Sequence, residues 1–146
     1  MDFSFTEEQE LLAENLVEFM DREYPESLIK ECDEQKIFPV EANKKFYEAG
    51  FGAIGVPEEL GGVPADMVTM CLVTSIVYRY SWAGCTYSPL SIMNAADKAS
   101  PEIRTEMLEG LMSGEKRHSF GNTEPVAGSD AAGIKTSDWF CVRKGE

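Results

Sequence analysis

The chain has 146 residues, enough for one domain with a hydrophobic core, and 43% of them are hydrophobic, which argues against disorder. Its formal net charge is −13, from 13 basic and 26 acidic side chains. Nucleic-acid binding needs a basic face that releases counterions, and anionic membrane surfaces attract basic segments. We therefore expect neither nucleic acid nor a membrane as a partner.

The cysteines argue against a metal site and for a reducing compartment. Cys32, Cys71, Cys85 and Cys141 form no CxxC pair, and His118 is the only histidine. No metal is therefore expected. Cys71 and Cys85 lie in apolar stretches and are predicted to be core residues. The absence of a disulfide framework and of a basic signal-peptide start predicts a cytoplasmic location.

The first half of the chain is predicted to be helical. The stretch TEEQ at residues 6–9 has the form of a capping box, and apolar residues then recur at helical spacing to about residue 24. The opposite face of this helix is acidic and is expected to face solvent. A weaker helix is predicted over residues 26–32, and a third over residues 39–50, with proline at its start and glycine at its end.

A buried connector, a turn and a central helix are predicted next. Residues 51–56 are apolar and glycine-rich without periodicity, and PEELGG at residues 57–62 is a turn signal. A helix is predicted over residues 64–80, with Pro64 and Asp66 in its first turn. Because it is apolar nearly all round, we expect it to be buried centrally.

The last third changes from helix to a β pattern. Helices are predicted over residues 84–96 and 101–114, followed by short strands over residues 117–123 and 134–142. Two strands alone are marginal in water, so the chain is predicted to stop inside a β domain. The expected fold is mainly α: an N-terminal helical bundle over residues 1–116 and the beginning of an incomplete β domain over residues 117–146.

The loop between the expected strands, TEPVAGSD at residues 123–130, has two interpretations. Thr123 and Ser129 offer hydroxyl groups, and Gly128 and Gly133 allow close approach of a ligand to the backbone. Successive N–H groups in such a turn can hold phosphate oxygens. The octapeptide by itself favours an ordinary surface turn, because short motifs have high false-positive rates.

Taken together, the stretches MDFSFTEEQELL, GFGAIGVPEELGG and GLMSGEKRHSFGNTEPVAGSDAAGIKT resemble the N-terminal half of the acyl-CoA dehydrogenase family. The resemblance covers essentially the whole chain, and PEELGG and TEPVAGSD are its sharpest motifs. It implies an N-terminal helical domain, a middle β domain and a C-terminal helical bundle. This chain would hold the first of these and only the opening strands of the second.

The resemblance also implies a FAD site and the residues that form it. Phe120, Asn122 and Thr123 would approach the pyrimidine edge of the flavin. Gly128 and Ser129 would face the pyrophosphate, and Ser129 would also approach the acyl-CoA. The chain departs from the family pattern at Val126, where a small residue, often glycine, is usual, and at Asn122, where an aliphatic residue is more typical.

The implied function is that of a flavin-dependent oxidoreductase acting on the Cα–Cβ bond of acyl-CoA or enoyl-CoA thioesters. In most members the catalytic base is a glutamate of the C-terminal bundle, so no catalytic residue is expected here, and the chain alone is expected to be inactive and to hold FAD weakly or not at all. An electron-transfer flavoprotein would serve the full-length enzyme, which would be a homo-oligomer. The alternative is a non-catalytic, truncated relative that acts as a helical protein-interaction module.

Three further stretches resemble a particular branch of the family. They are ECD at residues 31–33, FP at residues 38–39 and GCTY at residues 84–87. They are similar to enzymes that handle carnitine-derived enoyl-CoA thioesters such as crotonobetainyl-CoA, which implies reduction of a double bond. The same residues can instead pack helices together.

Overall fold

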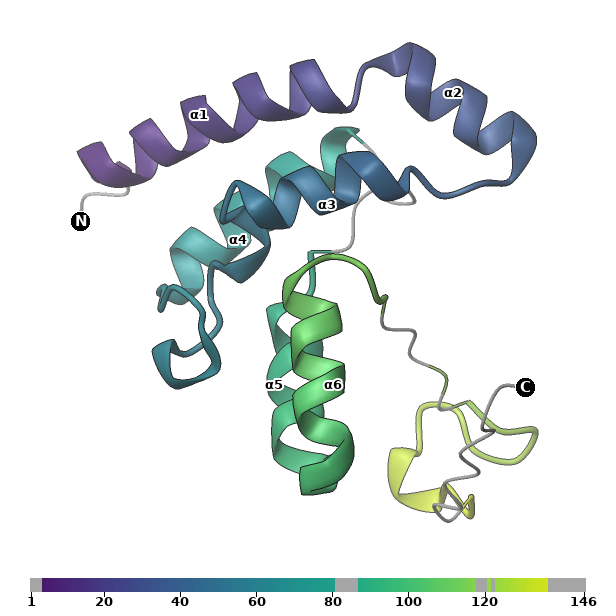
Figure 1. Ribbon diagram of the computed structural model, residues 1–146. Coiled ribbons are helices and arrows are strands. Elements are labelled where there is room, and N and C mark those ends of the chain that lie inside the picture. Colours follow the sequence, from purple (N-terminus) through teal and green to yellow (C-terminus); the bar gives the residue numbers. More distant parts are fainter. Residues whose placement is uncertain (1–3, 81–86, 118–120, 122, 137–146) are drawn as a thin grey trace.

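The computed structural model describes residues 4–80, 87–117, 121 and 123–136, and within these it is mainly helical (Figure 1). Three short 3-10 turns separate or follow the helices, namely η1 (Phe51–Ala53), η2 (Glu58–Leu60) and η3 (Ala131–Gly133). The six α-helices are α1 (Glu7–Glu23), α2 (Glu26–Gln35), α3 (Val40–Glu48), α4 (Met67–Tyr80), α5 (Pro89–Lys98) and α6 (Pro101–Met112). The prediction of a mainly α fold is confirmed.

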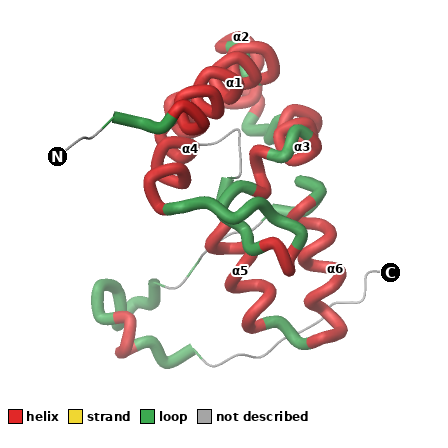
Figure 2. The backbone as a smooth tube through the Cα atoms, turned by 90° about the vertical axis from the view of Figure 1, so that its left-hand side faces the viewer, coloured by secondary structure: helices red, strands yellow, loops and turns green. Residues whose placement is uncertain are grey.

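The helices form two groups (Figures 1 and 2). The long helix α1 packs along α4, and α3 leads into the η1 turn that packs back against it. Helices α5 and α6 lie side by side as a separate hairpin below this group. No helix in the described part of the chain has both the length and the apolar character needed to cross a membrane.

The predicted start of α1 and the predicted glycines after α3 and α6 are confirmed, and all three depend on local capping. The N–H of Gln9 donates to the Thr6 hydroxyl at 3.2 Å, and the N–H of Thr6 donates to Oε1 of Gln9 at 3.1 Å, which completes the capping box. Gly50 follows α3 with φ 86°, and Gly114 follows α6 with φ 71°. Both have the left-handed conformation that glycine adopts easily after a helix.

Helix α4 differs from the prediction in its start and in its burial. It begins at Met67, because the Asp66 carboxylate accepts the N–H of Thr69 at 2.7 Å and so caps the helix from outside. The prediction that Pro64 and Asp66 form its first turn is therefore wrong. Only one side of α4, with Val73, Ile76 and Val77, is buried. The prediction of burial all round is also wrong.

The prediction that Cys71 is a core residue is wrong, because Cys71 is exposed on α4. Cys85 lies outside the described residues, so the same expectation for it has no structural counterpart. Helix α5 begins at Pro89, later than the predicted start, and α2 continues to Gln35, beyond the predicted end.

The predicted strands are not seen in the described parts of residues 117–123 and 134–142, and most of both ranges lies outside those parts. Within the described residues, β pairing is limited to isolated bridges between Ile54 and Val63 and between Glu124 and Ala127. The physical reason is that a strand needs a partner for its backbone groups. At residues 135 and 136, a side chain accepts the N–H groups instead.

The core is centred on Phe46, which is fully buried. Its ring lies 5.9 Å from those of Tyr47 and Phe51, 6.1 Å from that of Phe19 and 6.4 Å from that of Tyr87. These are distances at which tilted and edge-to-face aromatic pairs are favourable. The cluster therefore joins α1, α3, η1 and the segment that leads into α5.

Candidate functional site

Two contacts hold the chain where it leaves the helices, shortly before the TEPVAGSD loop. The buried Asn43 amide donates to the carbonyl oxygen of Gly114 at 3.0 Å, and so ties the end of α6 to α3. Farther along, the Arg117 guanidinium lies 4.0 Å from the centre of the Phe38 ring. A cation over an aromatic face is attracted to it. Neither contact joins neighbours in the sequence, and no local pattern predicts them.

The loop itself is closed by a tight turn and by one carboxylate. Glu124 and Ala127 exchange backbone hydrogen bonds of 2.9 and 3.2 Å around Pro125 and Val126. The Glu124 carboxylate accepts the N–H groups of Lys135 at 3.0 Å and of Thr136 at 2.7 Å, and also the Thr136 hydroxyl. Glu124 therefore joins the two ends of the segment 124–136, a role that the sequence motif did not reveal.

This arrangement lowers the pKa of the Glu124 carboxyl below its ordinary value of 4.5, first through the Thr136 hydroxyl and then through the two N–H groups. Since the pKa is lower in the folded loop, the carboxylate stabilises the loop above pH 4.5. That stabilisation is lost as the pH falls through the lowered value.

We therefore predict that the amide signals of Lys135 and Thr136 in a ¹⁵N–¹H NMR spectrum titrate together below pH 4.5. The change Glu124→Gln should abolish this titration, because the amide carries no charge. Asp130→Asn is the matched control, since the Asp130 side chain caps no backbone group of the η3 turn. The prediction is wrong should Glu124→Gln leave the titration unchanged.

Three of the five predicted FAD-site residues lie in the described part of the loop. Thr123, Gly128 and Ser129 are all exposed. Among the described residues, the two hydroxyl groups make no hydrogen bond, and the N–H groups of Gly128 and Ser129 have no backbone partner. A Cβ added at Gly128 would meet no described atom within 4 Å. Unpaired donors beside open space fit a pyrophosphate group.

The other two predicted residues, Phe120 and Asn122, lie outside the described residues. Val126, the departure from the family pattern, is 75% exposed and makes the tip of the turn. The loop stands apart from the described helices in both views (Figures 1 and 2).

The second motif, PEELGG, has a steric explanation within the chain. Gly61 has φ 80°, and a Cβ at Gly62 would lie 2.3 Å from the Cβ of Val56 and 2.4 Å from its carbonyl oxygen. The two glycines therefore allow the chain to turn and pass close to its own backbone. The motif serves the fold in this chain.

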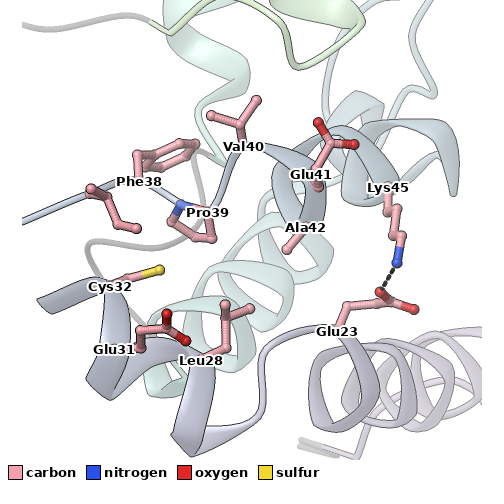
Figure 3. A pocket seen from close by; sticks show the side chains of 11 residues that line it. Glu23, Leu28, Glu31, Cys32, Phe38, Pro39, Val40, Glu41, Ala42 and Lys45 are labelled. Atoms are coloured by element: carbon pink, nitrogen blue, oxygen red, sulfur yellow. Dashed lines mark hydrogen bonds and ion pairs between the residues drawn. The ribbon is translucent and has the colours of Figure 1, made fainter. Parts of the chain in front are cut away.

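A separate pocket lies between α2 and α3 (Figure 3). Its volume is about 340 Å³, and Lys45 at its edge pairs with Glu23 at 2.7 Å, which lowers the pKa of that carboxyl. The lining includes Glu31, Cys32, Phe38 and Pro39, four of the residues in the stretches that resemble the crotonobetainyl-CoA branch. None of the predicted FAD-site residues lines it.

No group of three or more His, Cys, Asp or Glu side chains is placed to hold a metal ion within the described ranges. Such ligand sets are the usual basis of a protein metal site.

These features define a small helical domain followed by an exposed, glycine-containing loop. Residues 6–115 match the family described as acyl-CoA dehydrogenase, N-terminal domain. The chain belongs to the acyl-CoA dehydrogenase family. This confirms the family resemblance, and the matched residues include PEELGG.

Three curated relatives illustrate the match. The chain is 33% identical to the "Probable acyl-CoA dehydrogenase YdiO" of Escherichia coli (strain K12), over 89% of the chain and 34% of the relative. It is 35% identical to the "Acryloyl-CoA reductase (NADH)" of Anaerotignum propionicum, over 94% of the chain and 35% of the relative. It is 33% identical to the "3-(aryl)acrylate reductase" of Clostridium sporogenes, over 91% of the chain and 36% of the relative.

The chain thus spans about a third of the length of the curated relatives it matches. No solved structure matches it.

Proposed function

We propose that this chain supplies part of the FAD and thioester site of an oxidoreductase that acts on the Cα–Cβ bond of acyl-CoA or enoyl-CoA. The observation that carries the proposal is the exposed loop at Gly128 and Ser129. Its N–H groups have no backbone partner among the described residues, and the space beside Gly128 is open. A close contact with Val56 explains why residue 62 is a glycine. No described contact explains why residue 128 is one.

The roles of individual residues are those that the family resemblance implies. The N–H groups of Gly128 and Ser129 would hold the pyrophosphate, and the Ser129 hydroxyl would also meet the thioester substrate. The Thr123 hydroxyl, with Phe120 and Asn122, would lie along the pyrimidine edge of the flavin. When bound, FAD supplies hydride acceptance and donation, and a hydroxyl placed at that edge stabilises the negative charge of the reduced ring.

No residue of the chain is proposed as the catalytic base. Glu124 is unsuited to that role, because three donors hold its carboxylate and lower its pKa. A base works best when its pKa lies near the operating pH. The chain alone should therefore be inactive, and acyl-CoA oxidation by it would contradict the proposal.

The same proposal covers the direction of the reaction and the partners of the complete enzyme. Two of the relatives are named as reductases, of acryloyl-CoA and of 3-(aryl)acrylate, which favours reduction of a double bond. A complete enzyme of this type would act in the cytoplasm as a homo-oligomer, with an electron-transfer flavoprotein as its redox partner. Residues 117–146 would begin its β domain, and residues 1–116 would form its helical domain.

The test is an NMR titration of the ¹⁵N-labelled chain with FAD, ADP and riboflavin at millimolar concentration. FAD and ADP, which carry a pyrophosphate, should shift the Gly128 and Ser129 amide signals, and riboflavin should not. After desalting, the visible spectrum should show no retained flavin band, since binding to this one wall of the site is weak. The alternative, a helical interaction module, predicts no shift with any of the three compounds.

Two variants and one control sharpen the result. Gly128→Val places a side chain in the open space and should weaken the shifts caused by FAD, whereas Ser129→Ala keeps its N–H group and should weaken them less. Ser27→Ala is the matched control, because Ser27 is also exposed but lies on α2. Absence of shifts at Gly128 and Ser129, or equal shifts in all variants, would overturn the assignment.

A further inference from the structure

The loop of residues 123–136 packs on itself. Ala127 is only 3% exposed, although the residues on both sides of it are exposed. A Cβ added at Gly133 would lie 3.8 Å from the Cβ of Ala127 and 2.7 Å from a carboxylate oxygen of Asp130. The N–H of Gly133 also donates to the Asp130 carbonyl oxygen at 3.1 Å. Compact surface loops of this kind are held by their own contacts and frequently have a function.

Both oxygens of the Glu124 carboxylate are used to hold the far end of this loop. Oε2 accepts the N–H of Lys135 at 3.0 Å, and Oε1 accepts the N–H of Thr136 at 2.7 Å together with the Thr136 hydroxyl. An ionised carboxylate is a pure acceptor with room for several donors. A side chain with a single acceptor oxygen could not accept hydrogen bonds in the same way on both sides.

The backbone of Glu124 holds the other part of the loop. It exchanges hydrogen bonds of 2.9 and 3.2 Å with Ala127, the residue directly before Gly128. One residue therefore anchors the end of the loop through its side chain and the start of the Gly128–Ser129 step through its backbone. Donors that are ordered in advance bind a ligand more tightly, since less freedom is lost on binding.

We propose that Glu124 and Thr136 are positioning residues, which hold the N–H groups of Gly128 and Ser129 in place for a pyrophosphate group. The choice of ligand rests on the proposed function. Glu124 acts through the loop and not by contact with the ligand, because a carboxylate repels a phosphate. The Thr136 hydroxyl contributes the third hydrogen bond, the one that depends on a side-chain donor.

The first measurement is the backbone order of Gly128 and Ser129, from ¹⁵N relaxation of the full 146-residue chain. In Glu124→Gln the amide offers one oxygen, and its NH₂ group would face a backbone N–H. The order parameters of both amides should then fall towards the value of about 0.6 or less that flexible backbone shows. Thr136→Val should have a smaller effect in the same direction, and Thr136→Ser, which keeps the hydroxyl, should restore the order.

Lys135→Ala is the matched control, because Lys135 donates to Glu124 through its backbone N–H, which alanine keeps. Its order parameters should equal those of the unchanged chain. Urea unfolding followed by circular dichroism should give similar midpoints for all these variants, since the loop stands apart from the described helices (Figures 1 and 2). A change confined to the loop is thereby separated from a loss of the helical fold.

The second measurement is the dissociation constant of ADP, obtained from the shifts of the Gly128 and Ser129 amide signals. Glu124→Gln should weaken ADP binding about fivefold, the size expected for the net loss of one hydrogen bond. Thr136→Ser and Lys135→Ala should bind as the unchanged chain does. Equal binding by the unchanged chain and Glu124→Gln would overturn the positioning roles and leave the proposed function standing.

The positioning roles are also wrong should Glu124→Gln leave the order parameters unchanged, or should Lys135→Ala lower them as much. Should ADP shift neither amide of the unchanged chain, the proposed function fails. In that case the order parameters alone decide whether Glu124 and Thr136 hold the two N–H groups.

Discussion

Phe46→Ala is expected to destabilise the chain by about 3–5 kcal/mol, the usual cost of removing a fully buried aromatic ring. The ring is 0% exposed and contacts aromatic side chains from four segments, so its loss leaves a cavity that none of them can fill alone. A domain of this size is stable by about 5–15 kcal/mol in total. The variant should therefore be largely unfolded at moderate temperature.

The measurement is urea unfolding followed by circular dichroism, with the midpoint compared between variants. Leu11→Ala is the control, because Leu11 is 59% exposed and makes no part of the core cluster. Its midpoint should remain close to that of the unchanged chain. Equal midpoints for Phe46→Ala and Leu11→Ala would show that the aromatic cluster does not hold the helices together.

Gly62→Ala is the second change with a large expected effect, although it adds a single methyl group. The new Cβ would lie 2.3 Å from the Cβ of Val56 and 2.4 Å from its carbonyl oxygen. The backbone cannot move away easily, because the N–H of Gly55 donates to the carbonyl of Val63 at 2.8 Å on the same turn. Overpacking of this kind costs about 1–3 kcal/mol or more.

The matched control is Gly128→Ala, in which the added Cβ meets no described atom within 4 Å. Urea unfolding should show a lower midpoint for Gly62→Ala and an unchanged one for Gly128→Ala. A pair of equally stable variants would contradict the steric explanation of PEELGG. The contrast between the two glycines also bears on function, because a glycine that the fold does not need is available for a ligand.

The two family motifs therefore differ in physical role. PEELGG lets the chain turn and pass close to Val56, a requirement that is met entirely within the helical domain. TEPVAGSD is closed by the Glu124 carboxylate and presents unpaired donors outward. The first motif stabilises the body of the domain, whereas the second leaves the N–H groups of Gly128 and Ser129 without a backbone partner among the described residues.

The features that the sequence determined by itself depend on residues that are neighbours along the chain. The capping box at Thr6 and Gln9, the glycines after α3 and α6, and the proline at the start of α6 act within a few residues. The helices were therefore predicted nearly in place. The family could also be inferred, because PEELGG and TEPVAGSD are contiguous motifs.

The tertiary structure decided which faces are covered and which distant groups meet. Apolar composition predicted that α4 is buried all round, but burial depends on the helices that pack against it, and here one face has no partner among the described residues. The Glu124 carboxylate meets Lys135 and Thr136, and the Arg117 guanidinium meets Phe38, only because the backbone brings them together. Contacts between residues far apart in the sequence leave no local pattern, so only the folded chain reveals them.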